Sequence, residues 1–170
     1  MIETDRLILR RFEPADVDMI ARWNEDELFT RHLAGPITRE QTARAFERWQ
    51  RHWDEHGFGQ LAVVSKETGE LIGRTGPQFH RAWPPDPEIG WGLDPAWWGR
   101  GLATEAGRAC VDWSLGELGL ARVVSITTEG NVASRRVMEK LGFELLQLVP
   151  FPKMGLDLWV HALDRKALYP

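Results

Sequence analysis

The segment at residues 87–113 constrains the fold more than any other part of the chain. An alternating stretch, "PEIGWGL", is followed by "DPAWWGRG" and then by Leu102, Ala106 and Cys110 at helical spacing. This pattern predicts a strand that turns through two glycines into a helix. The first backbone N–H groups of such a helix have no partner within it, and the helix dipole adds about half a positive charge there. The turn therefore suits an anion such as a phosphate, although two glycines between a strand and a helix also make an ordinary tight connection.

The rest of the chain alternates between strand-like and helix-like patterns. Helices are predicted at residues 14–24, 38–56 and 131–141, the second with Thr38 and Gln41 as a capping box. Further strands are predicted at residues 6–12, on both sides of the turn "KETGE", and at residues 121–129, 144–149 and 156–163. We therefore predict a single α/β (α+β) domain over residues 1–170, with a mostly antiparallel, twisted sheet of seven strands flanked by about four helices.

The composition excludes several classes of protein. A net charge of −4 and a pI near 5.8 argue against a nucleic-acid partner, since phosphate binding usually needs clustered basic residues. No apolar run approaches the about 18 residues of a membrane span, and the charged start "MIETDRLILR" is unlike a signal peptide. Cys110 is the only cysteine, so the chain forms no internal disulfide. We expect a cytoplasmic protein without a membrane partner.

Three stretches of the sequence together resemble the GNAT superfamily of acyl-CoA N-acyltransferases. They are "ETDRLILRRFEPAD" near the start, "EIGWGLDPAWWGRGLATEA" in the middle and "EGNVASRRVMEKLGFE" at residues 129–144. Within the superfamily they are similar to the ribosomal-protein N-terminal acetyltransferase (RimJ/RimL-like) branch. The resemblance covers most of the chain and implies a GNAT-type fold. In that fold the fourth strand, at residues 87–93, splays from the fifth strand, at residues 121–129.

The resemblance also implies that acetyl-CoA is the cosubstrate and that no metal takes part. Backbone amides of the glycine turn would hold the pyrophosphate, and the turn comprises Trp98, Gly99, Arg100, Gly101, Leu102, Ala103 and Thr104. Trp98 stands where the family usually has Gln or Arg, which matters little if the backbone does the binding. Trp91 and Leu93 would pair their backbone with the pantetheine arm of the coenzyme. Asn131 would hydrogen-bond the same arm, and it also suits a plain helix cap.

Two residues are candidates for proton transfer. Glu88 shares a strand face with Gly90 and Gly92, whose missing side chains leave room for a substrate, so it could act as a general base through a water. The alternative for Glu88 is a solvated carboxylate at the start of a strand. Many relatives protonate the departing thiolate with a tyrosine at the place where this chain has Met138. Ser134 is the remaining hydroxyl near the expected sulfur, as a proton donor and coenzyme contact or as a local backbone partner.

No motif in the sequence identifies the amine acceptor. The stretches "FTRHLAGPITRE" and "HRAWPPDPE" are expected to border its pocket, with Trp83, Trp97 and Trp98 as candidates for the wall. We predict acetyl transfer to a primary amine, which is either a protein N-terminal α-amine or a small molecule such as an antibiotic or a polyamine. The alternative is a non-catalytic acyl-CoA-binding module, in which Glu88 and Ser134 have no chemical role. A monomer and a homodimer are both compatible with the sequence.

Other conspicuous residues have simpler interpretations. His52 and His56 lie four apart on one predicted helix, but no cysteine or carboxylate completes a recognised metal-ligand set. Cys110 lies on the inward stripe of its helix and is expected to be a small core residue. Trp49 and Trp53 keep helical spacing and are expected to pack inside.

Overall fold

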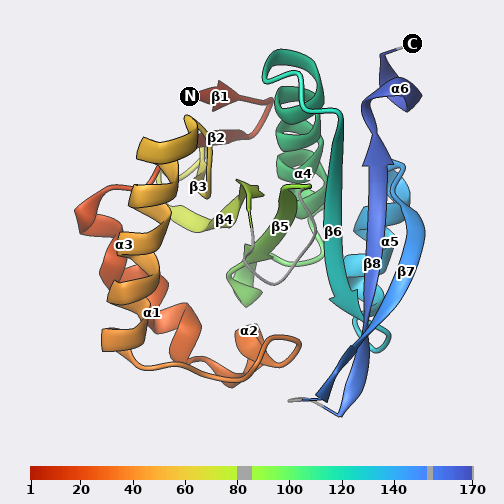
Figure 1. Cartoon of the computed structure of the whole chain (residues 1–170). Coiled ribbons are helices and arrows are strands. Elements are labelled where there is room, and N and C mark those ends of the chain that lie inside the picture. Colours follow the sequence, from red (N-terminus) through yellow and green to blue (C-terminus); the bar gives the residue numbers. More distant parts are fainter. Residues whose placement is uncertain (80–85, 153–154, 170) are drawn as a thin grey trace.

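A computed structural model of the chain describes residues 1–79, 86–152 and 155–169. These residues form a single eight-stranded sheet with helices against both of its faces (Figure 1). The strands are β1 (Ile2–Glu3), β2 (Leu7–Arg11), β3 (Leu61–Ser65), β4 (Leu71–Gln78), β5 (Glu88–Leu93), β6 (Arg122–Thr128), β7 (Glu144–Phe151) and β8 (Leu156–Asp164). The helices are α1 (Val17–Glu25), α2 (Glu27–Thr30), α3 (Arg39–His56), α4 (Leu102–Asp112), α5 (Val132–Leu141) and α6 (Arg165–Leu168).

The sheet is divided between β5 and β6. Its strand order is β1-β2-β3-β4-β5-β6-β8-β7, and every neighbouring pair is antiparallel except β5 and β6. Those two strands are parallel and pair only at Glu88 and Val124, where the Val124 N–H donates to the carbonyl of Pro87 at 3.0 Å. Beyond this point none of the described residues pairs with β5 on its β6 side. The predicted splay between the strands at residues 87–93 and 121–129 is thus confirmed.

The structure contains more elements than the seven strands and roughly four helices predicted from the sequence. The additional strand, β1, has two residues, and the additional helices, α2 and α6, have four residues each. Such elements span only about one period of the strand or helix pattern, so the sequence carries no repeating signal for them. The class, a single mixed α/β domain, agrees with the prediction.

Alternate side chains of the strands pack into two separate cores. In β3, Leu61 and Val63 belong to the larger core, which also contains Ala106 and Cys110 of α4. Ala62, between them, faces the smaller core beneath α1 and α3. This period-two alternation is that of a sheet covered on both faces. Two layers of helices therefore flank the sheet, and the splay of β5 opens between them.

Local capping residues set the ends of the helices that carry the site. Thr38 Oγ1 accepts from the Gln41 N–H, and Gln41 Oε1 accepts from the Thr38 N–H at 2.8 Å, so the predicted capping box of α3 is confirmed. Asn131 caps α5 by accepting from the Ser134 N–H at 3.2 Å. Gly142 ends α5 with a φ of 89°, which other residues adopt only with strain. None of the described helices combines the length and apolar character needed to cross a bilayer.

Candidate functional site

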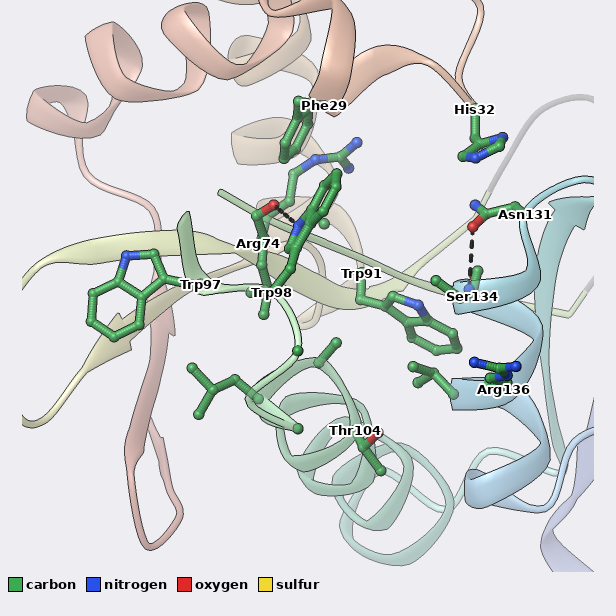
Figure 2. Close-up of a pocket in the computed structure, with 18 of the residues that line it drawn as sticks. Phe29, His32, Arg74, Trp91, Trp97, Trp98, Thr104, Asn131, Ser134 and Arg136 are labelled. Carbon is green, nitrogen blue, oxygen red and sulfur yellow. Dashed lines mark hydrogen bonds between the residues drawn. The ribbon is translucent and has the colours of Figure 1, made fainter. Parts of the chain in front are cut away.

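A cavity of about 380 Å³ lies at the end of β5 (Figure 2). Its walls come from α2 and the residues that follow it, from β4 and β5, from the turn into α4, and from α5. Figure 2 shows Phe29, Arg74 and Trp98 grouped at one end, and Asn131 and Ser134 at the other. Most of the predicted coenzyme residues line this cavity, namely Trp91, Leu93, Trp98, Gly99, Gly101, Leu102, Ala103, Thr104, Asn131 and Ser134. Four segments that are distant in the sequence therefore meet at one concave surface.

The glycine turn presents unpaired backbone donors to this cavity. Gly99 and Gly101 have φ values of 76° and 78°, a left-handed conformation that strains any residue with a Cβ. The first bond of α4 runs from the Glu105 N–H to the Gly101 carbonyl at 3.1 Å. The N–H groups of residues 102–104 therefore have no partner within the helix. Because these residues line the cavity, the positive end of the α4 dipole faces into it.

Arg6, a residue that the sequence did not single out, braces the turn from outside. Its guanidinium pairs with Glu105 Oε2 at 2.6 Å, and its Nη1 donates to the carbonyl of Arg100 at 3.0 Å. The Arg100 side chain does not line the main cavity. Its guanidinium lies 4.8 Å from the ring centroid of Trp97, and it borders a second cavity of about 360 Å³ together with Arg6 and Lys66. Any contact of Arg100 with a ligand in the main cavity would have to come from its backbone.

Trp98 is fixed across the beginning of the turn. Its indole N–H donates to the carbonyl of Leu93 at 2.7 Å, which ties the turn to the end of β5 (Figure 2). The guanidinium of Arg31 lies 5.1 Å from the Trp98 ring centroid, so the residue after α2 covers this part of the cavity. The indole holds the conformation of the turn and leaves the backbone donors of α4 free.

Asn131 and Ser134 stand opposite the turn at the start of α5. The Asn131 side-chain oxygen accepts from the backbone of Ser134, so the cap predicted from the sequence is present (Figure 2). Asn131 and Ser134 both line the cavity, so the cap of α5 is also part of its wall. Met138, one helical turn further on, is fully buried in the core and cannot contribute to the cavity.

Glu88 lies beside the cavity on the face of β5 that also carries Gly90 and Gly92. It is partly buried and is not itself a lining residue, and its Oε1 lies 3.9 Å from the position that a Cβ on Gly90 would occupy. The side chain therefore extends along the strand toward the cavity. Burial raises the pKa of Glu88 to about 7, while the positive charge of Arg74 on the neighbouring strand acts in the opposite direction.

Part of the segments predicted to border the acceptor pocket lines the cavity. Phe29, Arg31, His32 and Leu33 line the cavity, whereas the rest of "FTRHLAGPITRE" does not. A Cβ on Gly92 would lie 2.9 Å from Phe29 Cζ, so this glycine is required for α2 to approach the sheet. Of "HRAWPPDPE", residues 80–85, with Trp83, lie outside the described residues. Its described part, residues 86–88, does not line the cavity.

The lining of the cavity is strongly cationic. Its charged side chains are those of Arg31, Arg74, Arg136 and Lys140, and no Asp or Glu occurs among the described residues that line it. The pKa of the fifth titratable residue, His32, is lowered by burial and by the charge of Arg31. This surface is therefore positively charged, although the chain as a whole has a net charge of −4. Arg74 could have been noticed in the sequence as a charge in the middle of an otherwise uncharged strand, "LIGRTGPQ".

The residues set aside in the sequence have structural roles. Both ring nitrogens of His52 bond to backbone groups: Nδ1 donates to the Phe58 carbonyl at 2.8 Å, and Nε2 accepts from the Phe79 N–H at 2.9 Å. Cys110 is fully buried, which raises its pKa to about 12. Among the described residues no three His, Cys, Asp or Glu side chains are grouped closely enough to hold a metal ion.

Comparison with known proteins relates this chain to acetyltransferases. A family model described as an acetyltransferase (GNAT) domain matches residues 6–144. The chain is 32% identical over 151 residues to the uncharacterized N-acetyltransferase YoaA of Bacillus subtilis (strain 168), a match that covers 85% of this chain and 82% of YoaA. A crystal structure of an acetyltransferase from Agrobacterium tumefaciens str. C58 superimposes with a TM-score of 0.85 at 30% identity, over 95% of this chain and 92% of that one.

A more distant structure shows the same fold with a ligand bound. It is the spermidine N-acetyltransferase of Vibrio cholerae in complex with CoA and spermine, which superimposes with a TM-score of 0.80 at 17% identity. The match covers 96% of this chain and 98% of that chain. At this level of identity the similarity concerns the fold alone.

Proposed function

Because the chain belongs to the GNAT family of acetyltransferases, we propose that it transfers the acetyl group of acetyl-CoA to a primary amine. The observation that carries the proposal is the row of unpaired N–H groups at residues 102–104, which face the cavity from the positive end of α4. Backbone donors at a helix N-terminus suit a pyrophosphate, and the glycines before them allow its close approach. Arg136 and Lys140, which line the cavity from α5, would offset further phosphate charge.

The arm of the coenzyme would then run along the free edge of β5. Beyond Glu88 no strand among the described residues pairs with β5 on its β6 side, so the backbone at Trp91 and Leu93 can pair with the amides of pantetheine. The Asn131 amide, across the cavity, would bond the same arm in addition to capping α5. This arrangement brings the thioester to the region between Gly92 and Ser134.

Proton transfer would be divided between Glu88 and Ser134. With a pKa of about 7, Glu88 is about half ionised at neutral pH and can take a proton from the acceptor ammonium through a water. The free amine attacks the thioester carbonyl carbon, the C–N bond forms, and the C–S bond breaks as the tetrahedral intermediate collapses. The nitrogen of the intermediate releases its second proton to water, and the departing thiolate takes the proton of the Ser134 hydroxyl. Water then returns a proton to Ser134, so that the products are the N-acetylated amine, the free thiol of CoA and one proton held by Glu88. No metal is required for these steps.

Two classes of acceptor fit this chemistry. A protein N-terminal α-amine, the acceptor of the ribosomal-protein (RimJ/RimL-like) branch, has a pKa of about 8 and loses its proton readily near neutral pH. A small-molecule amine would use the same machinery. The cationic lining of the cavity disfavours polyamines and aminoglycoside antibiotics, since like charges repel within a partly desolvated site.

The proposal is tested by measuring coenzyme binding and turnover separately. Calorimetry on the folded protein should detect binding of acetyl-CoA and of CoA, and amines should accelerate release of free thiol from acetyl-CoA. Glu88→Gln should keep coenzyme affinity and lose turnover. Absence of any affinity for acetyl-CoA would overturn the proposal. Coenzyme binding without acceleration by any amine in a broad screen would favour the non-catalytic alternative.

A further inference from the structure

Most of the N–H donors of the Arg74 guanidinium have no hydrogen-bond partner among the described residues. Its Nε atom is buried without a hydrogen-bond partner. Its hydrogen bond to the described residues runs from Nη1 to Gln60 Oε1 at 3.5 Å, the long limit for such a bond. The described residues place no carboxylate oxygen within ion-pair distance of it. Its other close contact is the face of Trp49, 5.5 Å from the ring centroid.

An arginine in this position requires an explanation. A guanidinium presents donors in a fixed planar fork, and removing it from water is costly unless an anion or several acceptors compensate. Gln60 cannot turn to serve it better, because this buried amide also donates from Nε2 to the Gly76 carbonyl at 3.1 Å. Burial accordingly lowers the pKa of Arg74. The free side of the fork belongs to the cavity, which Arg74 lines.

The coenzyme does not account for this charge. Arg136 and Lys140 belong to α5, beside the donors of α4 that suit phosphates. Arg74 lies at the other end, opposite Gly92 in the register of β4 and β5 and close to Phe29, which packs on Gly92 (Figure 2). This is the acceptor side of the cavity.

We propose that Arg74 binds a carboxylate of the acceptor, so that the amine acetylated by this protein belongs to an amino acid or another small amino-carboxylate. The inference rests on the proposed function, and it assigns the substrate class of the same site. A carboxylate matches the guanidinium fork with two parallel hydrogen bonds, which a hydroxyl or an amide cannot provide.

Glu88 and Arg74 together complement such a zwitterion. Both side chains occupy the same face of the sheet, since Arg74 pairs with Gly92 and Glu88 lies four residues earlier on β5. That spacing is roughly 13 Å along the strand at about 3.3 Å per residue, and the Glu88 side chain shortens it by extending over Gly90. Gly90 leaves the floor beside Glu88 open, whereas the ring of Phe29 covers the floor at Gly92. A carboxylate held at Arg74 directs the amino group toward Glu88 and toward the thioester.

The test compares acceptors that differ only in the carboxylate. The panel contains L-amino acids and β-alanine, the matched amino acid amides, the decarboxylated amines, phosphoethanolamine, and a peptide with a free N-terminus and an amidated C-terminus. Thiol release gives kcat/KM for the wild type, Arg74→Gln and Arg74→Lys, with Arg44→Gln on the exposed face of α3 as the matched control. Each acceptor is compared between protein variants, so that differences in amine pKa cancel.

We expect Arg74→Gln to lower kcat/KM about 10- to 100-fold more for the carboxylates than for the amides and amines, as loss of a charged hydrogen bond requires. Loss of the Arg74 charge also raises the pKa of Glu88, which changes the turnover of all acceptors by a common factor. Arg74→Lys should restore part of the loss. Calorimetry of an accepted amino acid with the protein–CoA complex gives a readout independent of turnover, and Arg74→Gln should abolish this binding. Equal losses for amides and carboxylates would overturn the proposal, as would preference for the peptide or for phosphoethanolamine.

The outcomes separate this inference from the proposed function. If amines are acetylated regardless of a carboxylate, the acetyltransferase stands and the role of Arg74 is wrong. If no amine is acetylated and acetyl-CoA does not bind, both fail. A variant that merely misfolds is recognised by its thermal transition and by loss of coenzyme binding. In that case Arg74→Met, which keeps the apolar part of the side chain and removes only the charged group, replaces Arg74→Gln.

Discussion

As the proposed general base, the partly buried carboxylate of Glu88 would favour activity and oppose stability. Burial raises its pKa from 4.5 to about 7, so the folded protein holds the proton more tightly than the unfolded chain does. The stabilising contribution of this group is therefore complete below about pH 4.5 and is lost as the pH rises through about 7. The ionised form, which is the form that can act as a base, is the costly one.

We expect Glu88→Gln to lower kcat by about 100-fold or more, the usual contribution of a general base, and to raise the melting temperature at pH 8 but not at pH 4.5. The wild-type kcat/KM should rise through a pKa near 7, and this step should disappear in the variant. Differential scanning calorimetry at the two pH values and a pH–rate profile measure both effects. A variant that keeps the wild-type pH profile would contradict the assignment of the base.

The Ser134 hydroxyl is predicted to act as a proton donor, and the fold itself does not require this hydroxyl. Its backbone N–H completes the cap of α5, and this bond does not depend on its side chain. Ser134→Ala should therefore keep stability and coenzyme affinity while lowering kcat, by about 10- to 100-fold for loss of a proton donor. Thiol-release kinetics together with calorimetry of CoA make the comparison. Unchanged kcat would leave Ser134 as a local backbone partner.

At the scale of elements, the proposed function predicts that the turn between β5 and α4 sets coenzyme affinity through its backbone. Gly101→Ala forces a Cβ onto a residue with a φ of 78°, which costs about 1–2 kcal/mol and displaces the first N–H groups of α4. Gly119→Ala is the matched control, because Gly119 also has a positive φ, 66°, lies away from the cavity, and has no heavy atom within 4 Å of the position that a Cβ would occupy. Calorimetry with CoA should show weaker binding for Gly101→Ala alone, with similar losses of stability in both. Equal affinities would count against the pyrophosphate site.

His52 connects α3 to the end of β4 through a hydrogen bond. His52 accepts from the Phe79 N–H and donates to Phe58, an arrangement available only to the neutral ring. Burial is the main cause that lowers its pKa, so its contribution to stability is present above pH 6.5 and is lost as the pH falls through the lowered folded value. His52→Ala should cost about 1–3 kcal/mol at pH 8 and progressively less at lower pH. Urea unfolding at several pH values measures this, and a pH-independent difference would contradict it.

At the scale of the whole molecule, the proposed coenzyme site lies between two parts of the sheet. The turn into α4 belongs with β5, whereas Asn131 and α5 belong with β6 and β8, and these parts share a single pair of β5–β6 residues. A ligand that spans both should stabilise the fold by mass action, by about 2.7 kcal/mol at a hundred times its Kd. Saturating CoA should therefore raise the melting temperature and slow amide exchange at residues 98–104 and 131–137 together. Protection confined to one of the two segments would contradict a bridging site.

The sequence by itself determined the features that depend on near neighbours. The caps at Thr38 and Asn131, the glycines of the turn and the alternating cores all follow from residues within a few positions of one another, and so they were predictable together with the fold class. Only the tertiary structure decided that Arg74, Arg31 and Arg136 share a cavity and that no described carboxylate lines it. These charges come from a strand, a loop and a helix that are far apart in the chain. They are brought together by the pairing of β4 with β5, by the approach of Phe29 to Gly92 and by the divergence of β6 from β5. No local sequence pattern predicts that these charges lie close together.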